Sequence, residues 1–273
     1  MPVIANAEKL KWEWNFAKRN RQSEVIKVAY IDEITILEKC SEGMSPAEVY
    51  KCQLKNTVCY LKKIDDIFSA TTYSVKREAE MMMWLSGRLN VPDVIEYGTL
   101  GHSEYLIMSE IKGRHIDCFV SEPIKYIECL TKALRQLQAI DIVKCPFSSK
   151  IDLRLKELKY LLDHKIADVD VSNWEDTTEF DHPMELYKWL CENKPQEELC
   201  FSHGDIGANF FISDDGIYFY DLARCGVADK WMDIAFCVKD IREYYPDSDY
   251  EKLFFSMLGL EPDKKKINYY ILL

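Results

Sequence analysis

The spacing of apolar residues changes near residue 110, and this change constrains the fold more than any other feature of the chain. Before it, alternating and β-branched runs predict strands at 24–31, 34–37, 49–54, 58–62, 91–97 and 105–110, with a single helix at 74–88. After it, helical spacing predicts helices at 121–140, 150–165, 183–195 and from 229 onward, interrupted by a hairpin at 209–221 with Asp215-Gly216 as its turn. We therefore predict an α+β fold with a small β-rich lobe (1–110), a larger helical lobe (111–273) and a ligand cleft between them.

Composition limits the class of protein. The 273 residues are 48% hydrophobic and 12% aromatic, which is typical of a globular chain. No run of about 18 apolar residues occurs and the N-terminus carries no secretion signal, so we expect neither membrane insertion nor export. The ten cysteines include no Cys-x-x-Cys pair, which favours reduced core thiols in a cytoplasmic protein over a zinc site or a disulfide framework. The net charge of −11 argues against nucleic acid as a partner.

The negative charge is concentrated between residues 168 and 181, a stretch with six acids and no lysine or arginine. Such a run is often only a solvated face. It also suits a binding wall for a polycationic ligand, because its field would concentrate that ligand near a site. The sequence favours neither interpretation over the other.

Three oxygen-bearing side chains point to phosphoryl transfer. Asp205 follows an apolar run at 198–202 and a break at His203-Gly204, while Asn209 and Asp221 flank the predicted hairpin, which brings them together at its open end. An amide and a carboxylate side by side suit Mg²⁺, and Asp205 could receive the proton of a substrate hydroxyl. Asp205 alone could equally cap a turn, but the set of three favours an active site.

A second pair supports that interpretation. Glu78 lies on the apolar face of the predicted helix, where an unpaired carboxylate would be costly, and Lys62 ends the preceding strand. A Lys62–Glu78 pair would place an ammonium near nucleotide phosphates, although both side chains could instead face water. We expect structural roles for His203 and for Asp233, which should bond loop backbone, and an i, i+4 pair between Lys239 and Glu243.

At these positions the chain resembles the aminoglycoside 3′-phosphotransferases (kanamycin kinases), most closely the Gram-positive type. The likeness runs from about residue 41 to the end, through Glu42-Gly-Met-Ser, Tyr60-Leu-Lys62, Thr71-Thr-Tyr, Leu106-Ile-Met-Ser-Glu110, Asn173-Trp-Glu, Phe201-Ser-His-Gly-Asp205, Ala228-Asp-Lys-Trp and Tyr269-Tyr-Ile-Leu-Leu273. The resemblance implies a protein-kinase-like two-lobed fold and transfer of the ATP γ-phosphate, with Mg²⁺, to a hydroxyl of an aminoglycoside. It also implies antibiotic resistance as the outcome and a monomer or weak dimer as the assembly.

The resemblance also implies roles for individual residues. Asp205 would be the catalytic acid–base group, and Asn209 and Asp221 the magnesium ligands. Nucleotide would be bound by Lys62, which Glu78 holds, by the ring of Tyr60, by the loop at Ser45 and by the connecting segment Ser109, Glu110 and Ile111. Substrate would be bound by Glu175, Lys239 and Glu243, where Lys239 replaces the family's arginine.

Three departures from the family keep other functions open. The Asp205–Asn209 loop and the following hairpin are each one residue shorter than in the family, and the family's acidic, aromatic C-terminal residues do not follow Leu273. The alternatives are a nucleotide-binding pseudokinase without transfer activity, or a kinase for another small cationic hydroxyl compound such as choline or a sugar amine.

Overall fold

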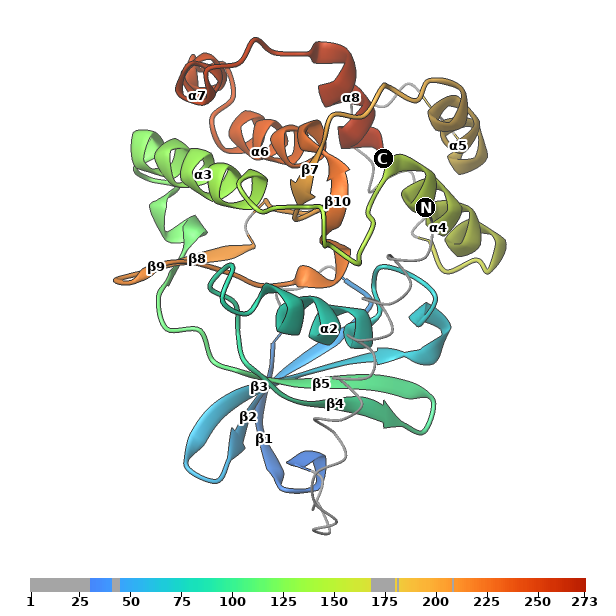
Figure 1. The fold of residues 1–273 in the computed structure, drawn as a ribbon, viewed down its shortest axis with the longest axis vertical. Coiled ribbons are helices and arrows are strands. Elements are labelled where there is room, and N and C mark those ends of the chain that lie inside the picture. Colours follow the sequence, from blue (N-terminus) through green and yellow to red (C-terminus); the bar gives the residue numbers. More distant parts are fainter. Residues whose placement is uncertain (1–29, 41–44, 168–179, 181, 208) are drawn as a thin grey trace, which may run out of the picture.

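A computed structural model of the chain describes residues 30–40, 45–167, 180, 182–207 and 209–273, and the following description concerns these residues. The change of periodicity near residue 110 coincides with a change of architecture. Strands dominate before it and helices after it, so the predicted α+β class is confirmed (Figure 1). Among the described residues, no helix combines the length and the hydropathy that a membrane crossing requires.

The smaller lobe is one five-stranded antiparallel sheet with a helix on one face. The spatial order of its strands is β1 (Ile34–Cys40), β2 (Glu48–Leu54), β3 (Thr57–Asp65), β5 (Ser103–Ser109) and β4 (Val94–Leu100). Helix α2 (Val75–Leu85) lies between this sheet and the larger lobe (Figure 1). Short 3-10 turns, η1 (Tyr30–Asp32) and η2 (Asp66–Phe68), flank the first three strands.

Strand β3 has a different environment on each of its faces. Cys59 and Leu61 are buried in a small apolar cluster with Cys52, Tyr105 and Ile107. Because successive side chains of a strand point to opposite faces, Tyr60 and Lys62 share the other face. On that face Lys62 is buried and contacts Glu78 of α2. The alternation therefore places a lysine, and an aromatic residue two positions before it, on the same side of the sheet.

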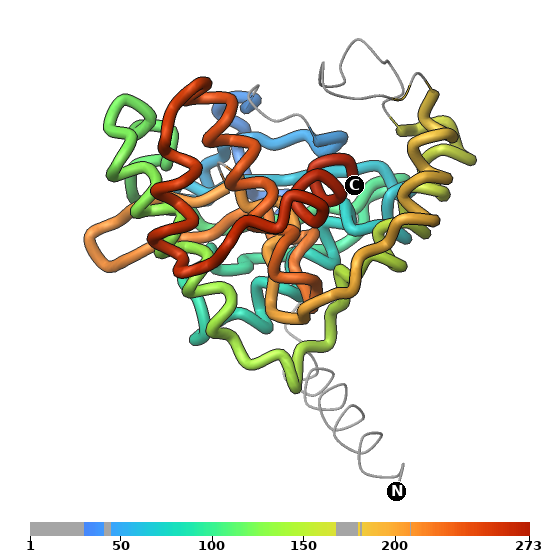
Figure 2. Tube along the Cα trace, turned by 90° about the horizontal axis from the view of Figure 1, so that it is seen from above, coloured from blue at the N-terminus to red at the C-terminus, as the bar shows by residue number. Residues whose placement is uncertain are grey.

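The larger lobe surrounds two small antiparallel sheets with helices. One sheet contains β6 (Arg114–His115), β8 (Phe210–Ser213) and β9 (Gly216–Phe219), and the other pairs β7 (Leu199–Ser202) with β10 (Gly226–Asp229). The helices are α3 (Pro123–Gln138), α4 (Ile151–Asp163), α5 (Pro183–Glu192), α6 (Lys230–Tyr244), α7 (Tyr250–Leu258) and α8 (Lys264–Leu272), with 3-10 turns η3 (Ile116–Phe119) and η5 (Leu222–Arg224). Helices α4 and α5 lie side by side at one edge of the molecule in both views (Figures 1 and 2).

Two details of the predicted strands are wrong. Residues 30 and 31, the end of the strand predicted at 24–31, do not form a strand, because Tyr30–Asp32 form a 3-10 turn. The Glu33 N–H closes this turn by donating to the Tyr30 carbonyl at 2.9 Å. Residues 24–29 lie outside the described part of the chain. The predicted hairpin turn also shifts by one residue, because Ser213 pairs with Gly216 and leaves Asp214 and Asp215 as the turn. Gly216 has φ of 139°, so it supplies the positive φ as the chain enters β9.

The two lobes share one hydrophobic core. Trp84 of α2 stacks on Phe201 of β7 with ring centroids 5.5 Å apart. The same core continues from Leu106 of β5 to the helices of the larger lobe, so α2 is packed from both sides. The small lobe is therefore not an independently packed unit.

Polar contacts join the lobes beside that core. Arg77 of α2 donates to the carbonyls of Ala223, Ser148 and Cys225 at 2.7, 3.0 and 2.9 Å. These three contacts use the fixed fork of the guanidinium, which can serve several acceptors at once. They fix the start of α2 against the segment that follows β9, which carries the candidate active-site residue Asp221.

A buried network links the loop before α2 to α4. The Thr72 hydroxyl donates to both carboxylate oxygens of Glu157 at 2.8 Å, and its backbone N–H also donates to Glu157. Arg154 donates to the Thr72 hydroxyl at 3.0 Å and lies 3.5 Å from Glu157. Buried charges are tolerated when paired and hydrogen-bonded in this way.

Candidate active site

The loop that presents Asp205 is held by a buried carboxylate. Asp233 accepts hydrogen bonds from the backbone N–H groups of His203 and Gly204, both at 2.8 Å, and is only 1% exposed. This confirms the expected structural role of Asp233. The His203 ring lies 2.9 Å from the Tyr220 carbonyl through Nε2, so His203 joins the loop to the end of β9 and is also structural.

Gly204 is required by the shape of this loop. Its φ is +80°, and a Cβ added there would lie 2.6 Å from the Arg224 carbonyl oxygen. Any other residue would meet both the strain of a left-handed backbone and a clash with neighbouring backbone. The glycine thus lets the chain turn sharply after β7 and present Asp205.

Asp205 has an unusually basic carboxyl group. Crowding by protein, followed by the negative charge of Asp221, raises its pKa to about 6. The side chain is still 35% exposed, so it can meet a ligand. Arg224 Nη1 lies 3.4 Å from its Oδ2, a long contact that holds the carboxylate without removing it from solvent. A carboxyl group with a pKa near neutrality and access to solvent can exchange a proton with a substrate.

Lys62 joins the two lobes through a pair of carboxylates. Its Nζ lies 2.8 Å from Glu78 Oε2 and 2.6 Å from Asp221 Oδ1. The second oxygen of Glu78 accepts the Leu222 backbone N–H at 3.1 Å. The predicted Lys62–Glu78 contact is therefore present, and Asp221 extends it across the lobe boundary.

Electrostatics favours the charged forms of Lys62 and Asp221, whereas burial raises the pKa of Glu78. Burial alone would lower the pKa of Lys62, but the charges of Asp221 and Glu78 outweigh burial and raise it. Burial likewise opposes ionisation of Asp221, and the Lys62 ammonium overcomes it and lowers the pKa of Asp221. Asp221 also has a left-handed backbone with φ of 56°, a conformation that non-glycine residues keep when surrounding contacts enforce it.

Asn209 and Asp221 could hold Mg²⁺ together with nucleotide phosphates. Within the described residues, no group of three or more His, Cys, Asp or Glu side chains is arranged for a metal. Nucleotide-bound Mg²⁺ needs no such group, because it takes one or two carboxylates and fills its other positions with water and phosphate. The Asn209 amide nitrogen donates to the Asp205 carbonyl at 2.6 Å, which leaves its oxygen as the possible ligand atom. A cation there would also offset the repulsion between Asp205 and Asp221, so the donor set fits Mg²⁺.

The residues predicted to bind nucleotide lie along β3 and the connection between the lobes. Tyr60 pairs with Met108 in the β3–β5 ladder, two positions from Lys62 and on the same face. Ser45 accepts the Ala47 N–H at 3.4 Å and precedes β2. The Ser109 N–H donates to the Asp93 carbonyl at 2.9 Å, so a base edge would have to meet Glu110 or Ile111 instead.

The predicted substrate contacts are brought together only in part. Lys239 and Glu243 both lie on α6. The first turn of this helix contains Asp233, which holds the loop that carries Asp205. Glu175 and nearly all of the acidic stretch 168–181 lie outside the described residues, as does Ala208 of the loop.

Asp240 is a residue that the sequence did not single out. Its Oδ2 is buried and has no hydrogen-bond partner within the described part of the chain, and it lies 3.4 Å from the position that a Cβ of Gly207 would occupy. Burial, followed by the charges of Glu243 and Asp205, raises its pKa to about 7. The sequence shows only that Asp240 lies beside the apolar face of a helix. It does not show that the loop at Asp205–Gly207 will cover this side chain.

Comparison with known proteins places the chain in a family. Residues 37–258 match the phosphotransferase enzyme family. An aminoglycoside 3′-phosphotransferase of Campylobacter jejuni is 84% identical over 244 residues, covering 89% of this chain and 98% of the relative. One from Enterococcus faecalis is 48% identical over 242 residues, covering 86% and 91%. The structure of aminoglycoside phosphotransferase APH(3'')-Id from Streptomyces rimosus, in complex with ADP and streptomycin, covers 86% of this chain and 90% of its own, with a TM-score of 0.69 at 21% identity.

These similarities agree with the site described above. The shared fold confirms the predicted kinase-like architecture, and the matched region includes Lys62, Glu78, Asp205 and Asp221. The resemblance seen in individual motifs is thus a resemblance of nearly the whole chain. The chain belongs to the aminoglycoside 3′-phosphotransferases, within the phosphotransferase enzyme family.

Proposed function

We propose that this enzyme transfers the γ-phosphate of ATP to a hydroxyl of an aminoglycoside antibiotic and thereby confers resistance. The observation that carries the proposal is the 2.6 Å contact of Lys62 with Asp221, which brings the ammonium of one lobe and a carboxylate of the other to the same point, close to Asp205. Phosphoryl transfer depends on such positioning and charge stabilisation more than on covalent chemistry. The names of the relatives support the aminoglycoside as acceptor.

The residues would divide the work as follows. Asp205 orients the acceptor hydroxyl and takes its proton, with a pKa of about 6 that leaves it ionised at neutral pH. Lys62, held by Glu78, binds phosphate oxygens. Asn209 and Asp221 hold Mg²⁺, which when bound offsets the charge of the phosphates.

Nucleotide would lie along the inner face of the small lobe. Tyr60 offers a ring for the base, Glu110 and Ile111 offer backbone groups to its edge, and Ser45 precedes the strand that covers the phosphates. We assign nucleotide binding to residues 1–110 and substrate binding to residues 111–273.

The acceptor would be recognised through its charge. Glu243 on α6 and Glu175 would supply carboxylates for ammonium groups, and Lys239, also on α6, would help to select hydroxyl positions. The net charge of −11 favours a cationic substrate and disfavours nucleic acid. We further propose that the enzyme works in the cytoplasm as a monomer or weak dimer, where ATP is available and ten unpaired thiols remain reduced.

The experiment is a coupled ADP-release assay with a panel of aminoglycosides, choline and sugar amines. We expect ADP release with aminoglycosides, and loss of release with retained ADP binding in Asp205→Ala. ADP binding without release for any acceptor would identify a pseudokinase. Release only with choline or a sugar amine would identify a different small-molecule kinase.

A further inference from the structure

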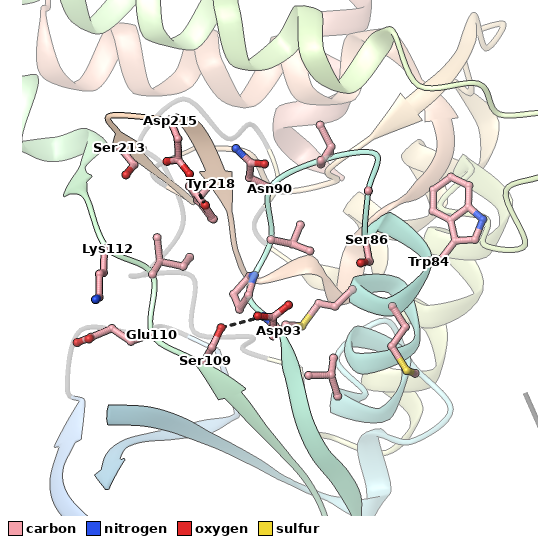
Figure 3. Close-up of a pocket in the computed structure, with 18 of the residues that line it drawn as sticks. Trp84, Ser86, Asn90, Asp93, Ser109, Glu110, Lys112, Ser213, Asp215 and Tyr218 are labelled. Atoms are coloured by element: carbon pink, nitrogen blue, oxygen red, sulfur yellow. Dashed lines mark hydrogen bonds between the residues drawn. The ribbon is translucent and has the colours of Figure 1, made fainter. Parts of the chain in front are cut away.

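A cavity of about 980 Å³ lies behind the connection between the lobes. Three segments far apart in sequence form its walls, namely the end of α2 with the loop to β4, the connection at 109–112, and the tip of the β8–β9 hairpin (Figure 3). Lys62, Asp205 and Asp221 are not among the residues that line it. The cavity therefore lies apart from Lys62, Asp205 and Asp221, although it adjoins the segment 109–111 that we assign to nucleotide, and its size is in the range of small-molecule sites.

The cavity combines an apolar wall with acidic groups at two ends. Its apolar lining comes from Met82, Met83, Trp84, Leu89, Val91, Pro92, Val94 and Ile111. Asp215 stands at the hairpin end, and Asp93 and Glu110 stand toward the small lobe (Figure 3). Asp214 precedes Asp215 in the hairpin turn and also lines the cavity. Lys112 is the one basic residue that lines it. Four carboxylates against one ammonium make the cavity suited to a cation.

Hydrogen bonds hold the walls in place. Tyr218 donates to Asp215 Oδ2 at 2.8 Å, so that carboxylate is oriented along the hairpin. The Phe219 N–H donates to the Asn90 carbonyl at 3.0 Å and ties the hairpin of the large lobe to the loop after α2. The Asp93 N–H donates to the Ser109 hydroxyl at 2.8 Å and fixes the opposite end. A site held in this way needs little reorganisation to accept a ligand.

We propose that this cavity is a second ligand site, for an amphiphilic amine with a flat apolar body and a protonated amino group. The apolar body would cover the apolar wall, where Met83 has a flexible side chain that can adjust to different shapes. The ammonium would lie beside Asp214 and Asp215, which are exposed and free of any lysine partner among the described residues. A hydrophilic polyamine would leave the apolar wall uncovered, and an anion would be repelled.

Occupation of the cavity would influence nucleotide binding, and this step rests on the proposed function. Ser109, Glu110 and Ile111 line the cavity on one side and belong to the segment assigned to nucleotide on the other. A ligand behind this segment restricts its position, so it changes the affinity for nucleotide. Thermodynamic reciprocity requires nucleotide to change the affinity for the ligand by the same factor.

Isothermal titration calorimetry with tryptamine as the probe tests the proposal on the full chain. We expect tryptamine to bind, and indole-3-propionate, with a similar ring and the opposite charge, not to bind. The double variant Asp214→Asn/Asp215→Asn should raise the dissociation constant of tryptamine about fivefold, as expected for the loss of two exposed charge contacts. The matched control Glu128→Gln/Glu261→Gln removes two exposed acids outside the cavity and should leave tryptamine binding unchanged.

A second variant tests location independently of charge. Ser86 is exposed and lines the cavity, so Ser86→Trp should block binding of the probe while the circular dichroism spectrum stays as in the parent chain. Unchanged tryptamine binding in both Ser86→Trp and the double variant would overturn the proposal. Complete displacement of tryptamine by ADP would place the probe in the nucleotide site and overturn it as well. Tryptamine binding is measured without turnover. A chain without kinase activity could therefore still bind tryptamine, so failure of the proposed function and failure of the cavity proposal can be told apart.

Discussion

Asp205 and Asp240 show how neighbouring acids set the chemistry of single residues. Both carboxyl groups have raised pKa values, about 6 and about 7, with burial as the main cause. Neighbouring acids add to this effect, since Asp221 raises the pKa of Asp205, and Glu243 and Asp205 raise the pKa of Asp240, because like charges disfavour ionisation. Only Asp205 lies in the loop that Asp233 holds, where the charge of Asp221 acts on it.

The pKa of Asp205 predicts the acidic limb of the activity profile. A general base must be ionised, so kcat/KM should rise with pH up to about 6 and level off above it. The midpoint of this limb lies well above the ordinary pKa of an aspartate, because burial favours the protonated form of Asp205. Measuring kcat/KM for an aminoglycoside from pH 5 to pH 8 checks this expectation, and a kcat/KM that stays constant down to pH 5 would contradict it.

Asp240→Asn should stabilise the protein at high pH. The folded pKa of about 7 exceeds that of an unfolded aspartate, so the folded state holds the proton more tightly and stability falls as pH rises from about 4 to 7. Asparagine removes the ionisation, so the variant should gain about 1 kcal/mol at pH 8 and much less at pH 5. Urea unfolding at both pH values measures the difference. An equal effect at pH 5 and pH 8 would show that the charge of Asp240 is not involved.

The sequence singles out candidate site residues where a polar side chain is unusual for its position in a strand or helix. Asp205, Asn209 and Asp221 stand out because polar side chains interrupt apolar strands, and Glu78 because it lies on an apolar helical face. Asp240 was missed since its environment comes from Gly207 and Asp205, which lie more than thirty residues earlier. No local spacing records such a contact.

At the scale of elements, the loop that carries Asp205 depends on one glycine, and an ion pair adds to the contacts that hold α2. Gly204 allows the turn after β7, and Glu78 fixes α2 to both Lys62 and the Leu222 backbone. Both features position groups that touch phosphate or the acceptor hydroxyl in the proposed reaction. Small displacements at such points cost large factors in rate.

Gly204→Ala should impair catalysis more than it impairs folding elsewhere. Its Cβ would lie 2.6 Å from a backbone oxygen at a φ of +80°, so the loop must shift. We expect at least a tenfold lower kcat and a loss of about 1–3 kcal/mol in stability. Gly259→Ala is the matched control, because Gly259 has a φ of +71° and no atom within 4 Å of the added Cβ. It should lose stability and keep kcat, and an equal loss of kcat in both variants would contradict the argument.

Glu78→Gln should weaken ATP binding and slow transfer. The amide keeps the size of the side chain but removes the charge that holds Lys62 against α2. We expect a higher KM for ATP, a kcat lower by about tenfold, and a loss of about 1–3 kcal/mol in stability. Glu80→Gln on the same helix, about 200° further around it, should behave like the parent enzyme. Steady-state kinetics with ATP as the varied substrate distinguishes the two variants, and equal KM values would reject the role of Glu78.

Elements were predicted better than their ends. Helix α2, the hairpin and the long helices all occur where periodicity indicated them. The hairpin turn was placed one residue late because Asp-Gly is a common turn pair, whereas here the glycine opens β9. Such a shift depends on strand register, which β6 and the loop after α2 help to set.

At the scale of the whole molecule, charge and core have separate roles. The net charge of −11 creates a field that attracts cations, and the shared core fixes how the lobes meet. The sequence predicted two lobes, but it could not predict that α2 would belong to the core of both. That arrangement follows from contacts such as Trp84 with Phe201, which are distant in sequence.

Salt should weaken the binding of the aminoglycoside more than the binding of ATP. Exposed acid-to-ammonium contacts are screened at high ionic strength, whereas buried Lys62 is screened much less. Raising salt from about 50 to 500 mM should increase the KM for the aminoglycoside several-fold and change the KM for ATP little. Kinetics at three salt concentrations measures both constants. A KM for the antibiotic that does not respond to salt would count against recognition by charge.

The anchoring of α2 by Arg77 and by the common core bears on how the chain could be divided. A protease nick within 110–113 would cut the covalent connection but leave α2 clasped by the larger part, so both fragments would co-elute. Either fragment expressed alone would expose apolar surface that its counterpart normally covers. Fused to two interacting proteins, the fragments would form a split reporter whose antibiotic resistance returns only when those proteins meet.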